Sequence, residues 1–182
     1  KSGKIGKIGL SNHSLAEIKE AADILAKEGL KISAIQNHYS LLNRSSETSG
    51  ILDYCKENDI IFFSYMVLEQ GALTGKYDTE HPFPEDSDRG RTYNPMLPQL
   101  EKLNAGLEEI ADRHHVATAQ IPMAWAIAKG TLPIIGVTKV YQVEDAVKAA
   151  EVELSAEEIE TIEKLGDEAQ LNVIRYWEKE MK

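Results

Sequence analysis

Short apolar runs alternate with longer amphipathic stretches along most of this chain. Short runs bounded by turn residues predict buried strands, and apolar residues at every third or fourth position predict helices. By these criteria the expected strands are 5–10, 30–36, 60–65 and 133–137. The expected helices are 14–28, 45–57, 100–111, 118–128, 143–150 and 155–165.

Helix starts are marked by local sequence signals. Ser14 with Glu17, and Ser155 with Glu158, have the spacing of a capping box, in which each residue bonds the backbone of the other. Thr118 is the expected N-cap of the helix that follows it.

The strand at 60–65 is the centre of the predicted fold. Its run of β-branched and aromatic residues predicts a strand that is buried on both faces. The turn after it contains Gly71 and Gly75, which allow the backbone to approach a ligand closely. Polar side chains follow or end the four strands at their carboxyl ends, where α/β folds place their functional sites. These residues are Asn12, Gln36, Tyr65 and Thr138.

The segment 78–98 contains four prolines among mixed charges, and we expect a long irregular loop with a binding or lid function. The rest of residues 1–165 forms the predicted α/β domain, and residues 166–182 form a C-terminal tail. The alternation of strands and helices predicts parallel strands with right-handed crossovers. It leaves a doubly wound open sheet and part of a (β/α)8 barrel as alternatives. No G-x-G-x-x-G sequence follows a strand, and its absence argues against a nucleotide-binding open sheet.

Composition narrows the function class. The formal net charge of −10 argues against a nucleic-acid-binding surface. No apolar run reaches 18 residues, so no membrane span is expected, and the single cysteine, Cys55, fits a cytoplasmic protein and a place in the core. The adjacent His114 and His115 lack a metal-ligand pattern and predict a helix end, so no metal site is expected.

Six stretches, in order, resemble the second half of an aldo-keto reductase. They are GKIGKIGLSN (3–12), QNHYSLLNR (36–44), YMVLEQGALTGKY (65–77), AQIPMAWAIAKG (119–130), PIIGVTK (133–139) and ELSAEEIETIEKL (153–165). The resemblance implies the C-terminal half of a (β/α)8 TIM barrel, with four parallel strands that match the fifth to eighth of the family. It also implies hydride transfer from NADPH to a small aldehyde or ketone. The catalytic Asp, Tyr, Lys and His of the family lie on the first four strands, so no catalytic residue is carried over and the chain alone is expected to be inactive.

The resemblance also implies the residues that hold the cofactor. Ser11, Asn12 and Gln36 match the residues that bind the nicotinamide carboxamide, and Tyr65 matches the aromatic ring that stacks on the nicotinamide. Along the pyrophosphate the matching residues are Met66, Leu68 and Gln70, within the turn 66–70. The family commonly has Ser-Pro at the place of Met66 and Val67, so backbone contacts are expected there in place of a hydroxyl contact.

The loop after the last strand matches the segment over the adenosine phosphate. Gly136, Thr138 and Lys139 are the matching residues, and Lys139 could pair with a 2′-phosphate. Gln142 stands where the family often has Arg, and Ala146 where it often has Asn, so NADH stays possible beside NADPH. Two further arginines, Arg89 and Arg91, could close over the cofactor from the long loop.

Three hypotheses remain open at this point. The first is the cofactor-binding half of a reductase, which pairs with an N-terminal half. The second is a non-catalytic nucleotide-binding module of the same family. The third is a half barrel that self-associates, because four strands leave two unpaired edges and an open apolar face. Tyr176 and Trp177 in the tail are candidates for lining a substrate pocket.

Overall fold

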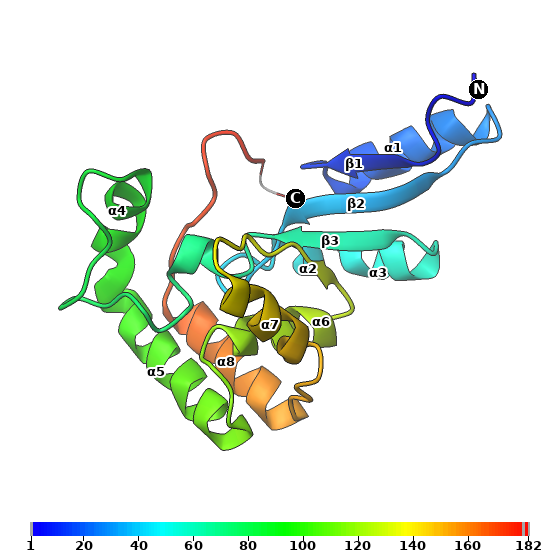
Figure 1. The fold of residues 1–182 in the computed structure, drawn as a ribbon. Helices are drawn as coiled ribbons and strands as arrows, with labels where there is room; N and C mark the ends of the chain where they lie inside the picture. The colour runs from blue at the N-terminus through cyan, green and yellow to red at the C-terminus, as the bar shows by residue number, and fades with distance from the viewer. Residues whose placement is uncertain (1, 180, 182) are drawn as a thin grey trace.

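The computed structural model describes residues 2–179 and 181. It contains one parallel sheet in the order β1-β2-β3-β4, which confirms the predicted α/β fold with four parallel strands (Figure 1). The strands are β1 (Ile8–Ser11), β2 (Ile32–His38), β3 (Ile61–Tyr65) and β4 (Leu132–Pro133).

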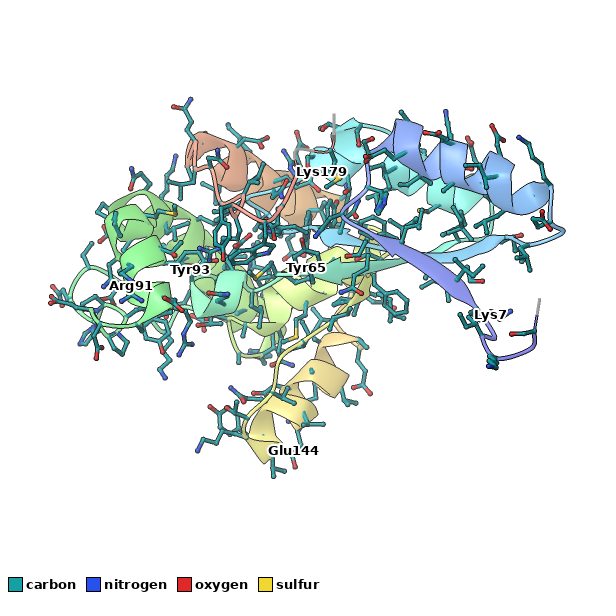
Figure 2. All side chains as sticks on the ribbon, turned by 90° about the horizontal axis from the view of Figure 1, so that it is seen from above. Lys7, Tyr65, Arg91, Tyr93, Glu144 and Lys179 are labelled. Carbon is teal, nitrogen blue, oxygen red and sulfur yellow. The ribbon has the colours of Figure 1, made fainter. Side chains whose placement is uncertain are left out.

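Eight α-helices and two short 3₁₀ helices connect or follow the strands in the described part of the chain. The α-helices are α1 (Leu15–Ala26), α2 (Ser45–Thr48), α3 (Ile51–Glu57), α4 (Asp88–Tyr93), α5 (Leu97–His114), α6 (Gln120–Ala128), α7 (Val140–Ala149) and α8 (Ala156–Glu168). The 3₁₀ helices are η1 (Glu69–Gly71) and η2 (Asn94–Met96). Figure 2 shows α7, which carries Glu144, standing away from the other helices.

The core lies between one face of the sheet and the helices. The predicted leucine stripe of α5 is buried in it, as is Trp125 of α6, whose ring stacks on Tyr39 with 4.9 Å between centroids. Cys55 is also buried, as predicted. No helix in the described ranges 2–179 and 181 is both long enough and apolar enough to cross a bilayer.

The two faces of the sheet differ in burial. Successive side chains of a strand point to opposite faces. Ile35 and Phe62 are register partners on the covered face and are almost completely buried, at 0% and 3% exposure. On the other face Ile61 and Leu132 are 52% and 51% exposed. The prediction that strand 60–65 is buried on both faces is therefore wrong, because helices cover only the face that would lie outside a barrel.

Strand boundaries differ from the prediction at both ends of the sheet. The first strand begins at Ile8 instead of residue 5, and the second extends to His38. The fourth strand contains only Leu132 and Pro133 where residues 133–137 were expected. One further ladder bond, from Ile134 N–H to the Ser64 carbonyl at 2.8 Å, ends the pairing before the chain turns into the loop 135–139.

Both predicted capping boxes are present, at Ser14 and Ser155. The helix expected at 45–57 is interrupted instead, because Gly50 adopts a left-handed conformation with φ of 80°. Thr118 is not the N-cap of α6: its carbonyl accepts from the Ile121 N–H, and the helix begins at Gln120.

Three further helix predictions need correction. The segment 78–98 is not wholly irregular, because the Ser87 hydroxyl accepts from the Gly90 N–H and caps α4. Helix α7 begins at Val140, three residues earlier than expected, and α8 continues past residue 165 to Glu168. The predicted helix end at His114 and His115 is confirmed, since α5 ends there with His115 in a left-handed conformation.

Gly166 marks a close approach between α8 and the segment after β2. A Cβ atom at Gly166 would lie 2.5 Å from the Leu41 carbonyl oxygen, whereas one at Gly6 would meet nothing within 4 Å. We expect Gly166→Ala to lower the free energy of unfolding by about 1–3 kcal/mol through overpacking, although alanine favours helices. Urea denaturation, with Gly6→Ala as control, checks this. Equal stability of Gly166→Ala and the wild type would contradict the described packing of α8.

Candidate functional site

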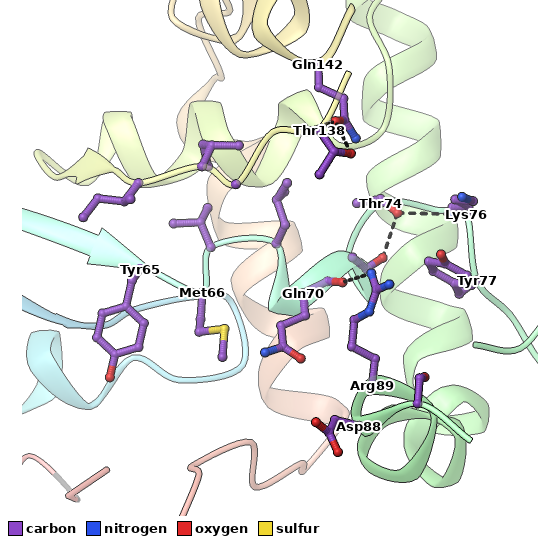
Figure 3. Close-up of a pocket in the computed structure, with 17 residues that line it drawn as sticks. Tyr65, Met66, Gln70, Thr74, Lys76, Tyr77, Asp88, Arg89, Thr138 and Gln142 are labelled. Carbon is purple, nitrogen blue, oxygen red and sulfur yellow. Dashed lines mark hydrogen bonds between the residues drawn. The ribbon is translucent and has the colours of Figure 1, made fainter. Parts of the chain in front are cut away.

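A cavity of about 890 Å³ lies beyond the carboxyl end of β3 (Figure 3). Its walls come from the turn after β3, from the start of α4 and from the loop between β4 and α7. The lining residues are Tyr65, Met66, Val67, Leu68, Gln70, Gly71, Thr74, Lys76, Tyr77, Ser87, Asp88, Arg89, Ile134, Ile135, Gly136, Thr138 and Gln142.

Most of the predicted cofactor residues line this cavity, although they come from segments about 70 residues apart in the sequence. They are Tyr65, Met66, Leu68, Gln70, Gly136, Thr138 and Gln142. Ser11, Asn12, Gln36 and Lys139 are outside the lining. Tyr176 and Trp177 are outside it as well, and their rings contact each other at 4.7 Å.

Asn12 and its neighbours lie at the adjoining strand ends. Ser11 and Gln36 are register partners in the sheet, and Asn12 follows them with φ of 58°. The Asn12 N–H donates to the Gln36 carbonyl at 3.2 Å and to Asn37 Oδ1 at 2.9 Å. The Asn12 side chain lies 2.7 Å from the Tyr65 hydroxyl. These contacts hold the ends of β1, β2 and β3 in one group beside the cavity.

The turn after β3 has an unusual backbone. Met66, Glu69 and Gln70 have φ of 61°, 45° and 54°, a left-handed conformation that is uncommon outside glycine and that clusters at functional sites. The Glu69 N–H donates to the Met66 carbonyl at 2.8 Å, so one backbone donor expected along the pyrophosphate is used within the turn.

Gln142 has a clear structural role on the opposite wall. Its Oε1 accepts from the Thr138 N–H at 2.7 Å and from the Lys139 N–H at 2.9 Å. These bonds close the start of α7, so the two N–H groups already have an acceptor. Lys139 follows the lining residue Thr138 and is exposed.

Two basic residues line the cavity, and the sequence reasoning missed one of them. Arg89 lies on the wall with its guanidinium 3.4 Å from the Gln70 carbonyl. Arg91 instead donates to the Asp86 carbonyl at 2.6 Å and pairs with Asp88, so the hypothesis of a paired arginine belt fits Arg89 alone. Lys76 also lines the cavity, and its position directly after Gly75 in the turn that follows β3 was the available signal.

Comparison with known proteins identifies the family. A model of the aldo/keto reductase family matches residues 1–167. The chain belongs to this family. It is 32% identical to a chloroplastic pyridoxal reductase of Arabidopsis thaliana, over 95% of this chain and 47% of that protein. It is also 32% identical to the aldo-keto reductase yakc [NADP(+)] of Schizosaccharomyces pombe, over 96% of this chain and 52% of that one.

A solved structure supports the fold of this aldo/keto reductase chain. The crystal structure of a thermostable aldo-keto reductase, Tm1743, in complex with the inhibitor epalrestat, matches with a TM-score of 0.67 and 27% identity. The match covers 87% of this chain and 48% of that protein. The chain therefore spans about half the length of the relatives it matches, and its parallel sheet has the fold of part of a TIM barrel.

A buried ionic cluster lies next to Tyr65 in this aldo/keto reductase chain, and the sequence reasoning did not find it. His38 Nε2 lies 2.7 Å from Glu69 Oε1, and His38 Nδ1 lies 2.8 Å from Glu178 Oε2. All three side chains are at most 3% exposed. Glu69 also accepts from the hydroxyls of Ser40 and Tyr93. Since 31 and 140 residues separate His38 from its two partners, no local pattern could have indicated the cluster.

The cluster sets the protonation of its members. Burial by itself lowers the pKa of His38, but the charge of Glu69 and hydrogen bonds to Glu178 and Glu69 outweigh it and raise the pKa to about 9. Burial by itself raises the pKa of Glu178, but hydrogen bonds from His38 and from the Arg175 N–H hold the pKa below its usual range. His38 is therefore an imidazolium at neutral pH, and it lies between the side chains of Glu69 and Glu178.

We expect this cluster to make stability depend on pH. A pKa of about 9 in the folded state, against 6.5 in the unfolded state, gives stabilisation that is complete below pH 6.5 and is lost as the pH rises through 9. The free energy of unfolding should fall by about 3 kcal/mol across this window. Urea denaturation at several pH values measures the fall.

Two variants make the assignment specific. His38→Gln should be less stable below pH 6.5 and should show a flatter curve between pH 6.5 and 9. His81→Gln, at a histidine that is 74% exposed, should keep the slope of the wild type. If His38→Gln retains the full pH dependence of the free energy of unfolding, that dependence arises from another group.

Proposed function

We propose that this chain is the cofactor-binding half of an NADPH-dependent aldo-keto reductase that reduces a small aldehyde or ketone. The supporting observation is the cavity itself, which brings the turn after β3 and the loop after β4 together around predicted cofactor residues. Its volume of about 890 Å³ lies within the range of about 300–1,000 Å³ for ligand pockets. When bound, NADPH supplies the hydride for carbonyl reduction.

The residues present fit such a cofactor. Tyr65 offers a ring in the cavity wall, beside the amide of Asn12. Lys76 and Arg89 supply positive charge in the wall, which suits a pyrophosphate. Thr138 lines the wall that the loop after β4 forms, and the adjacent Lys139 is exposed. Because the Tyr65 ring and the basic side chains are held in fixed positions, the chain would orient the nicotinamide. It would thereby contribute a positioning effect to catalysis.

The exposed inner face of the sheet supports the proposal that a partner completes the barrel. Ile61, Leu132 and Ile134 are 52%, 51% and 44% exposed on or beside this face. Apolar surface of this kind favours a covering element. We propose four further strands of the family fold as that element, which would also supply the catalytic residues. A second copy of this chain is the alternative partner, and the oligomeric state in solution separates the two.

The preference for NADPH over NADH can be tested at Lys139. If Lys139 pairs with the 2′-phosphate of NADPH, Lys139→Gln should weaken NADPH binding about fivefold, because an exposed ion pair contributes about 1 kcal/mol. NADH binding should not change. Isothermal titration of both nucleotides measures this, and Lys148→Gln, at an exposed lysine of the same helix, is the matched control. Absence of nucleotide binding by the wild type would overturn the proposed function, whereas equal loss for both nucleotides would overturn only the role of Lys139.

The isolated 182-residue chain should bind the cofactor without reducing carbonyl compounds. Hydride addition needs a proton donor at the carbonyl oxygen. Burial and the carboxylate of Glu178 raise the pKa of Tyr65, which makes this hydroxyl a poor acid. The measurement is the loss of NADPH absorbance with a panel of aldehydes. Turnover by the purified chain, verified by its mass, would refute the assignment of the acid–base groups to residues outside it.

A further inference from the structure

The C-terminal tail crosses the carboxyl ends of the strands and is anchored by polar contacts (Figure 1). Arg175 donates to the Thr92 hydroxyl at 2.7 Å and lies over the Tyr93 ring, 4.8 Å from its centroid. At the other end Lys179 pairs with Glu17, at the start of α1, at 2.6 Å. Between these anchors the tail brings one carboxylate, that of Glu178, to the ends of β2 and β3.

Glu178 is built into the protein interior. Its side chain is 1% exposed, and its Oε2 accepts from His38 at 2.8 Å and from the Arg175 N–H at 3.0 Å. Its Oε1 lies 2.9 Å from the Tyr65 hydroxyl. Because His38 also contacts Glu69, both of its ring nitrogens face carboxylates and both must donate. Glu178 is therefore ionised and can only accept hydrogen bonds.

The Tyr65 hydroxyl has one proton and two neighbours. Glu178 Oε1 lies 2.9 Å away and the Asn12 amide 2.7 Å away, with its oxygen toward the hydroxyl. In that orientation two acceptors would compete for a single proton. The ionised carboxylate makes the stronger bond and takes it. Turning the Asn12 amide over satisfies every group, because its NH₂ then donates to the Tyr65 oxygen while Tyr65 donates to Glu178.

Backbone contacts hold Asn12 in place beside Tyr65. Its N–H is held by Asn37 Oδ1, and the side chain of Asn37 is completely buried and donates to Ser46 at 3.2 Å. The remaining choice is which end of the Asn12 amide faces Tyr65. With the NH₂ facing Tyr65, the oxygen is left to accept from a ligand. This oxygen can accept a hydrogen bond from the N–H of a carboxamide, whereas it would repel the oxygen of a carboxylate.

We propose that Glu178 is a positioning residue that acts through Tyr65 to orient the Asn12 amide, so that the site accepts a nicotinamide and rejects the corresponding carboxylic acid. This inference rests on the proposed binding of a nicotinamide cofactor. It assigns to the tail a part in ligand selection, although Glu178 contacts the ligand only through two other side chains.

The test compares two nucleotides that differ only in this group, NADP⁺ and its deamidated analogue, nicotinic acid adenine dinucleotide phosphate. The wild type should bind NADP⁺ about tenfold or more tightly than the acid. The Asn12 oxygen accepts a hydrogen bond from the carboxamide of NADP⁺, but it faces a second acceptor in the acid. In Glu178→Gln the new NH₂ can donate to the Tyr65 oxygen, so Tyr65 can donate to Asn12 and the amide can turn back. The ratio should fall to about threefold or less.

Two further variants keep the result interpretable. Tyr65→Phe keeps the ring but removes the hydroxyl, and it should lower the same ratio if Glu178→Gln fails to fold. Lys179→Gln weakens another anchor of the tail and should leave the ratio unchanged, with circular dichroism as the check of folding. An unchanged ratio in folded Glu178→Gln and Tyr65→Phe would overturn the positioning role. Equal loss of affinity for both nucleotides would also overturn it, since it would show a structural effect only. Absence of NADP⁺ binding by the wild type would overturn the proposed function itself.

Discussion

A charged imidazole between two buried carboxylates connects three separate segments beside the site. His38 comes from β2, Glu69 from the turn after β3 and Glu178 from the tail. Removal of His38 would leave two buried carboxylates without their partner charge, which is strongly destabilising. The left-handed backbone at Glu69 is maintained against its intrinsic cost by these bonds, and the conformation of the turn after β3 depends on them. The same three side chains therefore hold the turn after β3 and the tail against the end of β2.

The sequence was sufficient for those parts of the fold that depend on local patterns. Capping at Ser14 and Ser155 involves residues three positions apart, so both boxes could be predicted and both are present. The sequence was insufficient where the structure depends on groups that are distant along the chain. Burial of Ile61 depends on what covers the sheet, and an apolar run cannot show that only one face is covered. Helix α4 was hidden by surrounding prolines, because a single Ser87 cap is a weaker signal than their number.

The candidate site divides in the same way. Resemblance to the family indicated Tyr65, Gln70 and Thr138, the last of which is distant from the other two in the sequence, and the structure brings all three to one cavity. It could not indicate that Gln142, at a position where the family often has arginine, would cap its own helix. Nor could it indicate Glu178, because a glutamate in a tail without regular structure looks like any other solvated charge.

The shortness of β4 has a consequence for motion. The loop that holds Thr138 and the helix α7 is joined to the sheet by a two-residue strand and one further backbone bond. Helix α7 buries only Ala149 and leaves Val140, Val143 and Val147 exposed. Segments with so little buried apolar surface open locally at low free energy, without global unfolding. We therefore expect the part of the cavity wall that contains Thr138 to exchange its amide hydrogens faster than the turn after β3, and a dinucleotide bound as proposed would begin to dissociate from that part.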